Sequence, residues 1–322
     1  MSPPRVPLVS LPTPLHRLAR ASADLGIDLW IKRDDLSGFA GGGNKGRKLE
    51  YLMAEVLNAG ADVVVSSGSS QSNFLRQLSC ACQMFGIHCA AASMDLPFDK
   101  GAGKPTGRHV TQGGNRVLDE MFGLEMRVYP DDDWEVLDQH AKAIAEEYEQ
   151  KGRTVRLIPT GGSTPTGAYG FYMAGNELSA QTKRPFDWIV TPTSSGSTHA
   201  GLGYCYFGST TRVIGVSCDP EPELDQDLSR LAAGLDAITG LDKRMSASDF
   251  DFRLDFVGPG YGVASAAGDE AIRYLIAREG VLLDPVYSGK AFSGLLALVR
   301  SGELEGRGVF WHTGGLPTLF AT

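Results

Sequence analysis

The sequence predicts an α/β protein with two lobes, each an open and mostly parallel sheet with helices on both faces. Short apolar segments alternate with long helical patterns along most of the chain, an order that is typical of parallel sheets. With 322 residues, the chain is long enough to form two such lobes. We expect residues 1–45 and 161–322 to form a larger domain and residues 46–160 to form a smaller one.

The expected strands and helices follow one another in a regular order. The valines Val63–Val65 indicate a buried strand over residues 61–67, because β-branched side chains suit a strand that is covered on both faces. Further strands are expected at residues 89–92, 124–129, 154–158, 188–190, 213–216 and 310–312, and helices at residues 72–85 and 134–150. Ligands of such sheets bind beyond the carboxyl ends of the strands, so loops 69–73, 194–198 and 313–315 should converge on one cleft.

Composition excludes several classes of function. The formal net charge is −8 and basic residues form no block, so we expect no nucleic-acid partner. No apolar run approaches the ~20 residues that span a bilayer, so no membrane association is expected. The five cysteines are too few for a disulfide framework in a chain of this length, and the N-terminus lacks the apolar stretch of a signal peptide. We therefore expect a cytoplasmic protein.

Lys45 is the first candidate for chemistry. It lies in a glycine-rich loop, residues 41–46 (GGGNKG), which leads into a helical pattern. Glycines allow another molecule to come close to the backbone and to the amine. A lysine whose pKa is lowered by its surroundings forms a Schiff base with a carbonyl compound. The alternative is an ordinary solvated loop lysine.

A loop rich in hydroxyl groups joins a predicted strand to a helix that we expect to begin near His199 or Ala200. Its N–H groups would lie at a helix N-terminus, where the dipole favours an anion such as phosphate. The loop contains Thr193, Ser194, Ser195, Gly196, Ser197 and Thr198. An ordinary capped loop is the alternative. The chain has no Walker motif and no good dinucleotide fingerprint, although Asp219 keeps a nicotinamide-dependent enzyme among the candidates.

Four further side chains could act on a ligand. Ser72 precedes a predicted helix and is either its N-cap or, with the loop amides, a binding group for a substrate carboxylate. Asn73 could donate a hydrogen bond to a phenolate oxygen. Tyr261 and Tyr287 lie among glycines in predicted loops, where they are candidate acid or base groups rather than packed tyrosines.

Several short segments occur in a characteristic order along nearly the whole chain. They are residues 11–15 (LPTPL), 30–35 (WIKRDD), 42–50 (GGNKGRKLE), 71–73 (QSN), 260–263 (GYGV), 284–287 (DPVY) and 312–315 (HTGG). Together they resemble the pyridoxal-phosphate enzymes of the tryptophan synthase β fold (fold type II). More narrowly, they resemble the branch that holds 1-aminocyclopropane-1-carboxylate deaminase and D-cysteine desulfhydrase.

This resemblance implies pyridoxal 5'-phosphate as the cofactor, bound mainly by the larger domain. It implies that Lys45 is the catalytic lysine that forms the Schiff base, and that Asn73 bonds the pyridoxal 3-oxygen. The cofactor phosphate would be bound by Ser194, Ser195, Gly196, Ser197 and Thr198.

The resemblance also implies a small amino acid as the substrate and, by analogy, a homodimer. Gln71 and Ser72 would hold the substrate carboxylate, and Tyr261 and Tyr287 would flank the substrate. Phe74 stands where the family usually has a polar residue, which bears on the substrate more than on the cofactor.

Two positions separate the branches of this family. Deaminases have Glu after the Tyr of Asp-Pro-Val-Tyr and Leu after the His of the final loop, whereas this chain has Ser288 and Thr313. Both match the desulfhydrase side, and both are expected to contact the cofactor. A carboxylate keeps the pyridine nitrogen protonated and the ring a strong electron sink, whereas a hydroxyl group leaves a weaker sink. Opening a cyclopropane should need the stronger sink.

We therefore expect a lyase that catalyses α,β-elimination from a β-substituted amino acid. With D-cysteine the products would be pyruvate, ammonia and hydrogen sulfide. The alternatives are a 1-aminocyclopropane-1-carboxylate deaminase, an L-cysteate sulfo-lyase, and a homologue that binds the cofactor without lyase activity.

Overall fold

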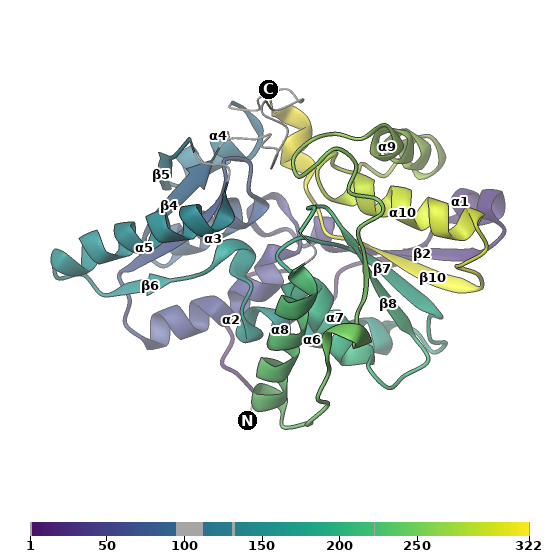
Figure 1. The fold of residues 1–322 in the computed structure, drawn as a ribbon, viewed down its shortest axis with the longest axis horizontal. Coiled ribbons are helices and arrows are strands. Elements are labelled where there is room, and N and C mark those ends of the chain that lie inside the picture. The colour runs from purple at the N-terminus through teal and green to yellow at the C-terminus, as the bar shows by residue number, and fades with distance from the viewer. Residues whose placement is uncertain (1, 95–111, 131–132, 222, 322) are drawn as a thin grey trace.

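The computed structural model describes residues 2–94, 112–130, 133–221 and 223–321 and contains two sheets (Figure 1). In the larger sheet the strand order is β1-β2-β10-β7-β8-β9, and every neighbouring pair is parallel except β1 and β2. Its strands are β1 (Leu15–Arg17), β2 (Asp28–Arg33), β7 (Trp188–Thr193), β8 (Arg212–Ser217), β9 (Asp251–Arg253) and β10 (Arg307–His312). The first and last parts of the chain thus share one sheet.

The smaller sheet is parallel throughout, in the order β5-β4-β3-β6. Its strands are β3 (Val63–Ser69), β4 (His88–Met94), β5 (Glu125–Val128) and β6 (Val155–Leu157). Val63 and Val65 pack into one apolar cluster, and Val64 packs into another on the opposite face. Both faces of β3 are therefore buried, which explains its unbroken run of valines.

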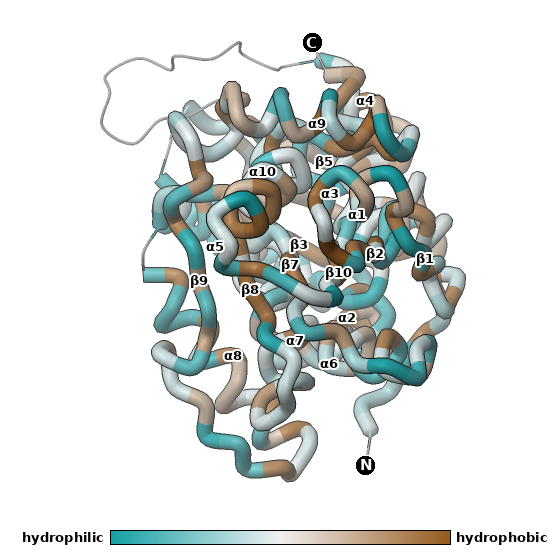
Figure 2. The backbone as a smooth tube through the Cα atoms, turned by 90° about the vertical axis from the view of Figure 1, so that its right-hand side faces the viewer, coloured by the Kyte–Doolittle hydropathy of each residue, from teal (hydrophilic) through white to brown (hydrophobic). Residues whose placement is uncertain are grey.

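Helices cover both faces of both sheets, so the predicted α/β class is confirmed. They are α1 (Ala19–Leu25), α2 (Lys45–Asn58), α3 (Asn73–Met84), α4 (Gly114–Met121), α5 (Trp134–Gln150), α6 (Pro165–Gln181), α7 (Ser197–Tyr206), α8 (Leu224–Thr239), α9 (Ala266–Glu279) and α10 (Ser288–Arg300). Figure 2 shows α1, α9 and α10 on one side of the larger sheet and α6 and α7 on the other. The domain boundaries at residues 46 and 160 stay a prediction.

Most expected elements lie where the sequence places them, with two instructive differences. Helix α7 begins at Ser197, two residues before His199. The cause is Gly196, whose φ of 88° ends the preceding loop directly at the helix. Strand β7 continues to Thr193 because Thr193 still pairs with Ser217 of β8.

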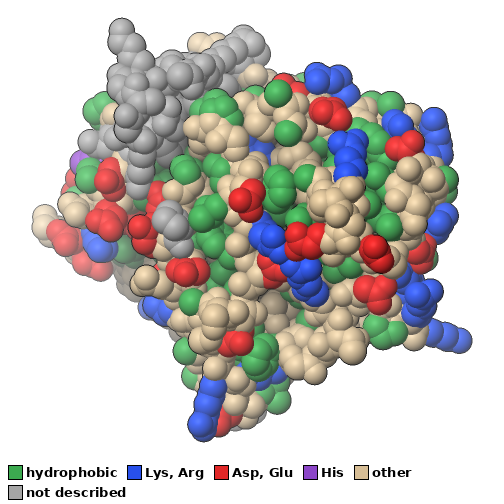
Figure 3. Space-filling model, turned by 45° about the vertical axis from the view of Figure 1, so that its right-hand side comes forward, with side chains coloured by type: hydrophobic (Ala, Val, Ile, Leu, Met, Phe, Trp, Pro, Cys, Tyr) green, Lys and Arg blue, Asp and Glu red, His purple; other side chains and the backbone are tan. Residues whose placement is uncertain are grey.

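The surface carries charges of both signs. On the face shown in Figure 3, basic side chains lie beside acidic ones rather than in a single block. Ion pairs such as Arg212 with Asp251 and Arg253 with Glu303 illustrate this mixing. Among the helices of the described residues, none is long and apolar enough to cross a membrane.

Candidate active site

A cavity of about 290 Å³ collects loops from both sheets. The loops that follow β3, β7, β8 and β10 all contribute to its wall, as expected for the carboxyl ends of parallel strands. Ten of the side chains predicted from the sequence line it: Lys45, Ser72, Asn73, Ser194, Ser195, Gly196, Thr198, Tyr261, Tyr287 and Thr313. Gln71, Ser197 and Ser288 do not line it.

Lys45 and Lys48 bring two amines to the same cavity from the first turn of α2. Burial lowers the pKa of Lys45 to about 8. Burial and the neighbouring Lys45 amine lower the pKa of Lys48 well below its usual value. Among the described residues neither amine forms an ion pair, and Lys48 donates a hydrogen bond to the Gly161 carbonyl at 3.2 Å. Two amines in this position can hold an anion or react with a carbonyl group.

Gly161 allows the cavity to form in this shape. Its φ is 67°, and a Cβ atom at this position would collide with the Ser195 hydroxyl group. The same Cβ would lie 3.9 Å from Lys45 Nζ. Only glycine therefore lets the Ser195 loop and the Lys45 amine approach one another.

The loop before α7 has the properties of an anion site. Gly196 turns the chain so that α7 starts at Ser197, and the N–H groups of its first turn have no partner within the helix. The Ser197 and Thr193 hydroxyl groups are buried and have no hydrogen-bond partner in the described part of the chain. Buried hydroxyl groups seldom remain without a partner. A phosphate group with Lys48 opposite would fit this loop.

Asn44 ties three loops together and was not singled out by the sequence analysis. Its backbone N–H donates to the Thr313 carbonyl at 2.9 Å, and its side-chain Nδ2 donates to Thr198 Oγ1 at 3.1 Å. Lys45 is therefore held between the phosphate-binding candidate loop and the loop after β10. The sequence signal was present, because Asn44 directly precedes Lys45, but the partners lie far away in the chain.

The N-terminus of α3 forms another part of the wall. Ser72 is its N-cap, and the Ser72 hydroxyl accepts from the N–H groups of Phe74 and Leu75 at 3.2 and 3.3 Å. Asn73 Oδ1 accepts hydrogen bonds from Arg76 and Asn115, so its NH₂ end is the one that can donate to a ligand. Capping and cavity lining therefore occur together at Ser72.

Gln71 points away from the cavity. Its side-chain Oε1 accepts from the Asn115 N–H at 2.9 Å, and its Nε2 donates to the Gly113 carbonyl at 3.2 Å. The side chain thus holds the start of α4, and only the backbone of Gln71 is available to a carboxylate at the α3 N-terminus.

Tyr261 and Tyr287 form a hydroxyl pair in the cavity wall. Their hydroxyl groups are hydrogen-bonded to each other, and Tyr261 also lies 3.4 Å from Ser69 Oγ. Trp134 packs edge-on against Tyr261, with 5.5 Å between ring centroids. Burial raises the pKa of Tyr261 to about 12 and that of Tyr287 well above 10. Both phenols are therefore protonated near neutral pH and can donate hydrogen bonds.

Ser288 and Thr313, the two branch-specific positions, differ in their surroundings. Thr313 lines the cavity, whereas Ser288 is fully buried behind it. Ser288 Oγ donates to Asp284 Oδ1 at 2.5 Å and accepts from the Asp284 N–H at 2.8 Å. The Ser288 hydroxyl group thus closes the turn before α10, and its contact with a cofactor stays a prediction.

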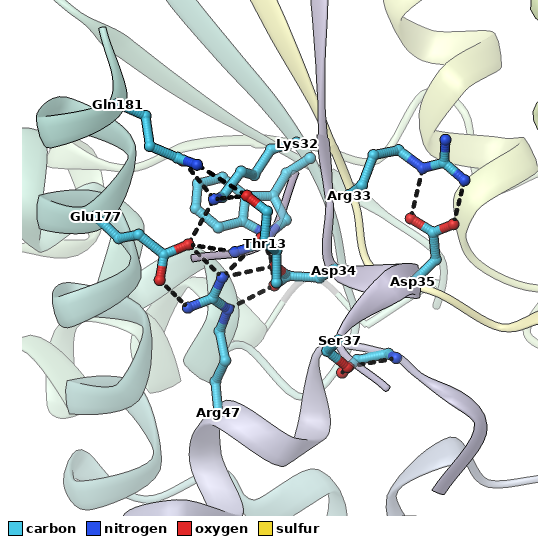
Figure 4. Close-up of polar contacts among 11 residues, drawn as sticks. Thr13, Lys32, Arg33, Asp34, Asp35, Ser37, Arg47, Glu177 and Gln181 are labelled. Carbon is cyan, nitrogen blue, oxygen red and sulfur yellow. Dashed lines mark hydrogen bonds and ion pairs between the residues drawn. The ribbon is translucent and has the colours of Figure 1, made fainter. Parts of the chain in front are cut away.

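Behind the cavity, a buried cluster of paired charges holds the Lys45 loop (Figure 4). Arg47 donates to Asp34 at 2.9 and 3.0 Å and to both carboxylate oxygens of Glu177 at 2.9 Å. Lys32 donates to Glu177 at 2.5 Å and to the Thr13 carbonyl at 2.8 Å. Two cations and two anions thus satisfy one another without a ligand. We call these four side chains the paired cluster.

Comparisons with known proteins agree with this geometry. A family model for pyridoxal-phosphate-dependent enzymes matches residues 6–314. D-cysteine desulfhydrase of Salmonella paratyphi B is 36% identical over 324 residues, which cover 99% of this chain and 96% of the relative. A Pyrococcus horikoshii protein with the provisional name 1-aminocyclopropane-1-carboxylate deaminase is also 36% identical, over 98% of this chain and 93% of the relative.

Solved structures give the same result for the fold. The crystal structure of an ACC deaminase homologue is 35% identical and superposes with a TM-score of 0.89, covering 99% of this chain and 94% of the other. O-ureido-L-serine synthase is 18% identical with a TM-score of 0.66, covering 95% of this chain and 90% of the other, and shares the fold alone. The expected fold type II architecture is confirmed.

Proposed function

The chain belongs to the family of pyridoxal-phosphate-dependent enzymes, and from this premise we propose that it catalyses α,β-elimination from a β-substituted amino acid. The substrate we propose is D-cysteine, which would give pyruvate, ammonia and hydrogen sulfide. One observation carries the proposal: a single cavity wall includes Lys45, the α3 N-terminus and the Tyr261–Tyr287 pair. Similarity to the Salmonella D-cysteine desulfhydrase over nearly the whole chain supports the substrate.

The cofactor would be held by residues from both sheets. Lys45 would carry the covalent linkage, and Lys48 would face the phosphate group together with the Ser194–Thr198 loop. The unpartnered Thr193 hydroxyl group, which lines the cavity beside this loop, supports this assignment, because an anion would satisfy a buried donor. Asn73 would donate its NH₂ group to the ring hydroxyl. When bound, pyridoxal phosphate supplies an aldehyde that condenses with amines and a ring that accepts electron density from the substrate α-carbon.

The substrate carboxylate would bind at the N-terminus of α3. Ser72 and Asn73 at this helix end line the cavity, and the helix dipole favours a negative charge there. Binding at this point fixes one end of the substrate between Lys45 and the two tyrosines. The backbone of Gln71 would contribute, whereas its side chain is engaged with α4.

Lys45 would accept the α-proton, and the tyrosine pair would stabilise the leaving group. With a pKa of about 8, the Lys45 amine is neutral in about a tenth of molecules at pH 7, and this form can accept the α-proton. Tyr261 and Tyr287 keep their protons because burial raises the pKa of both. One of these hydroxyl groups can therefore donate a hydrogen bond to the departing thiolate and stabilise its negative charge.

A second candidate is 1-aminocyclopropane-1-carboxylate deamination. The Pyrococcus relative and the crystal structure of the ACC deaminase homologue favour it. Against it stand Ser288 and Thr313, which replace the Glu and Leu of the deaminase pattern.

We also propose that the protein is a cytoplasmic homodimer. The family resemblance supports the dimer, and the five free cysteines support a reducing compartment. Light scattering on the purified holoenzyme should give twice the chain mass of 34.4 kDa. A mass of one chain would refute the dimer.

The function is tested by pyruvate release from the purified holoenzyme. The panel contains D- and L-cysteine, D- and L-cysteate, β-chloroalanine and 1-aminocyclopropane-1-carboxylate, the last assayed as 2-oxobutyrate. We expect D-cysteine to be the best natural substrate and the cyclopropane compound to react slowly or not at all. Equal rates for ring opening and thiol elimination would favour the deaminase instead.

A further inference from the structure

Arg76 on α3 reaches the glycine-rich loop that leads into α2. Its guanidinium donates hydrogen bonds to the backbone carbonyls of Ala40 and Gly42, the second at 3.0 Å. Gln77, the next residue of α3, donates to the same Gly42 carbonyl at 2.7 Å. Gly43 has a φ of 119°, and a Cβ atom there would lie 2.8 Å from Gln77 Nε2, so a side chain would push this amide aside. Two side chains of α3 therefore shape the glycine-rich loop.

The same guanidinium also contacts Asn73, one turn earlier on α3. Arg76 Nη2 donates to Asn73 Oδ1 at 3.2 Å, and Asn115 Nδ2 on α4 donates to the same oxygen at 3.1 Å. A guanidinium has no acceptor, so the atom that faces it must be the amide oxygen. The NH₂ end of Asn73 is left for the cavity, which Asn73 lines. Arg76 thus fixes which end of this amide a ligand meets.

The charge of Arg76 is not neutralised within the described part of the chain at neutral pH. The side chain is completely buried and donates there only to uncharged oxygens. Burial lowers the pKa of Arg76 to about 10, so the guanidinium stays protonated. Asp119 of α4 would offset this charge when ionised, but burial raises the pKa of Asp119 to about 8, so most of it is protonated at pH 7. The remaining positive charge polarises the Asn73 amide and makes its NH₂ group a better donor to an anionic oxygen.

We propose that Arg76 is a positioning residue for the cofactor: it orients and polarises the Asn73 amide so that the NH₂ group stabilises an anionic 3-oxygen on the pyridoxal ring. The inference rests on the proposed function, in which Asn73 donates to that oxygen. Arg76 does not line the cavity and acts through Asn73. Because Arg76 also holds the loop before Lys45, it keeps the donor to the ring oxygen in register with the amine that reacts with the aldehyde.

Binding of two forms of the cofactor tests this role. Pyridoxal phosphate and 3-deoxypyridoxal phosphate differ only in the ring hydroxyl group, and equilibrium dialysis of each against the apoprotein gives two dissociation constants. Their ratio measures how strongly the protein favours the ring oxygen. Arg76→Met removes the charge and keeps much of the apolar bulk of the side chain. We expect it to lower the ratio about tenfold, because only pyridoxal phosphate has the oxygen that the polarised amide stabilises.

Gln77→Met is the matched control, because Gln77 bonds the same Gly42 carbonyl but has no hydrogen bond to Asn73 among the described residues. It should weaken both ligands to a similar degree and leave the ratio within about twofold of wild type. Asn73→Ala should lower the ratio at least as much as Arg76→Met does, and combining the two should lower it no further. Should Arg76→Met fail to fold, Arg76→Gln keeps an NH₂ donor without the charge and should lower the ratio about threefold.

The outcomes separate this inference from the proposed elimination. If the ratio falls in the Arg76 variants but the holoenzyme eliminates no β-substituted amino acid, the elimination is wrong and the role of Arg76 stands. If the Arg76 variants weaken both forms of the cofactor equally, Arg76 holds only the loop and the inference is overturned. An unchanged ratio in Asn73→Ala would overturn it as well, because Asn73 would then not contact the ring oxygen.

Discussion

Helix α2 carries two kinds of cation within its first turn. Arg47 is surrounded by the carboxylates of Asp34 and Glu177, whereas Lys45 and Lys48 have no carboxylate partner among the described residues. The pKa values respond in opposite directions. Burial alone would lower the pKa of all three, but Asp34 and Glu177 outweigh it and raise that of Arg47. Burial prevails at Lys45 and Lys48 and lowers both.

This difference in charge pairing distinguishes a structural cation from candidate functional cations within one helix. A buried charge that is satisfied by the protein itself fixes the fold, and its loss leaves an uncompensated partner. A buried charge without a partner is costly unless a ligand completes it. The paired cluster therefore positions the loop, whereas under the proposed function the two lysines would serve the cofactor. The following predictions test this separation.

The largest effect is expected for Lys45→Ala. Loss of the amine removes both the covalent attachment point and the proposed base, so elimination should fall by about a thousandfold or more. Borohydride reduction followed by peptide mass spectrometry should place the pyridoxyl group on Lys45 in the wild type. Lys48→Ala is the matched control, because it should keep the covalent linkage and only weaken cofactor binding. A pyridoxyl group on Lys48 or Lys290 would contradict the assignment.

Glu177→Ala should mainly affect stability. It leaves Arg47 and Lys32 without a shared carboxylate and should lower the free energy of unfolding by about 3 kcal/mol, as urea denaturation of the apoprotein at pH 7 can measure. Glu147→Ala, which breaks an exposed ion pair with Arg127, should cost less than about 0.5 kcal/mol. If both variants cost the same, the paired cluster is not what holds the loop.

The effect of Glu177→Ala should also depend on pH. Burial alone would raise the pKa of Glu177, but the hydrogen bonds and charge of Arg47 and Lys32 lower it from 4.5 to about 2. The folded state therefore binds the proton less readily than the unfolded state. The stabilisation is complete above about pH 4.5 and is lost as the pH falls toward 2. The difference between variant and wild type should shrink over that range.

The sequence predicted much of the fold because most strands and helices are marked locally. Helix α5 spans the expected residues 134–150, and Lys45 opens a helix as expected. The paired cluster was beyond reach, because Arg47 and Glu177 are 130 positions apart and only the folded chain brings them together. The roles of Gly161 and Asn44 depend in the same way on loops that lie far away in the sequence.

Sequence motifs identified the proposed site residues. The hydrogen bonds that each residue forms in the fold determine whether its side chain faces the cavity. Ser288 and Thr313 are marked equally in the sequence, yet only Thr313 lines the cavity. The hydrogen bonds of Ser288 to Asp284 explain the difference, and no pattern of residue types indicates them.

Ser195→Asp tests whether the loop before α7, like Lys45 and Lys48, binds the cofactor. The new carboxylate would lie beside the cofactor phosphate, so like-charge repulsion should weaken cofactor binding by about tenfold or more. Equilibrium dialysis of pyridoxal phosphate measures this change. The same variant should bind pyridoxal, which lacks the phosphate group, almost as well as the wild type does. Equal loss for both ligands would indicate general damage to the loop.

A smaller effect, about tenfold per pH unit, is expected for cofactor attachment to the apoprotein. Only the neutral Lys45 amine can attack the aldehyde, and its pKa of about 8 sets the neutral fraction. The attachment rate should rise with pH below about 8 and level off above it. Stopped-flow absorbance after mixing with pyridoxal phosphate gives the rate. A profile that keeps rising to pH 10 would show that burial does not lower the pKa of Lys45.

The smallest effect is expected at Ser288. It decides whether this residue is satisfied within the protein, as Arg47 is, or needs the cofactor as a partner, as the two lysines do. In the structure its hydroxyl group is satisfied by Asp284, as Arg47 is satisfied by its carboxylates. Ser288→Ala should therefore lower the free energy of unfolding by about 1 kcal/mol, because the Asp284 N–H loses its acceptor. The visible absorbance of the holoenzyme and its rate of elimination should change little. Thr313→Val, which alters a cavity-lining hydroxyl group, should change the absorbance more. A clear spectral shift in Ser288→Ala would mean that Ser288 leaves Asp284 for the cofactor when the cofactor binds.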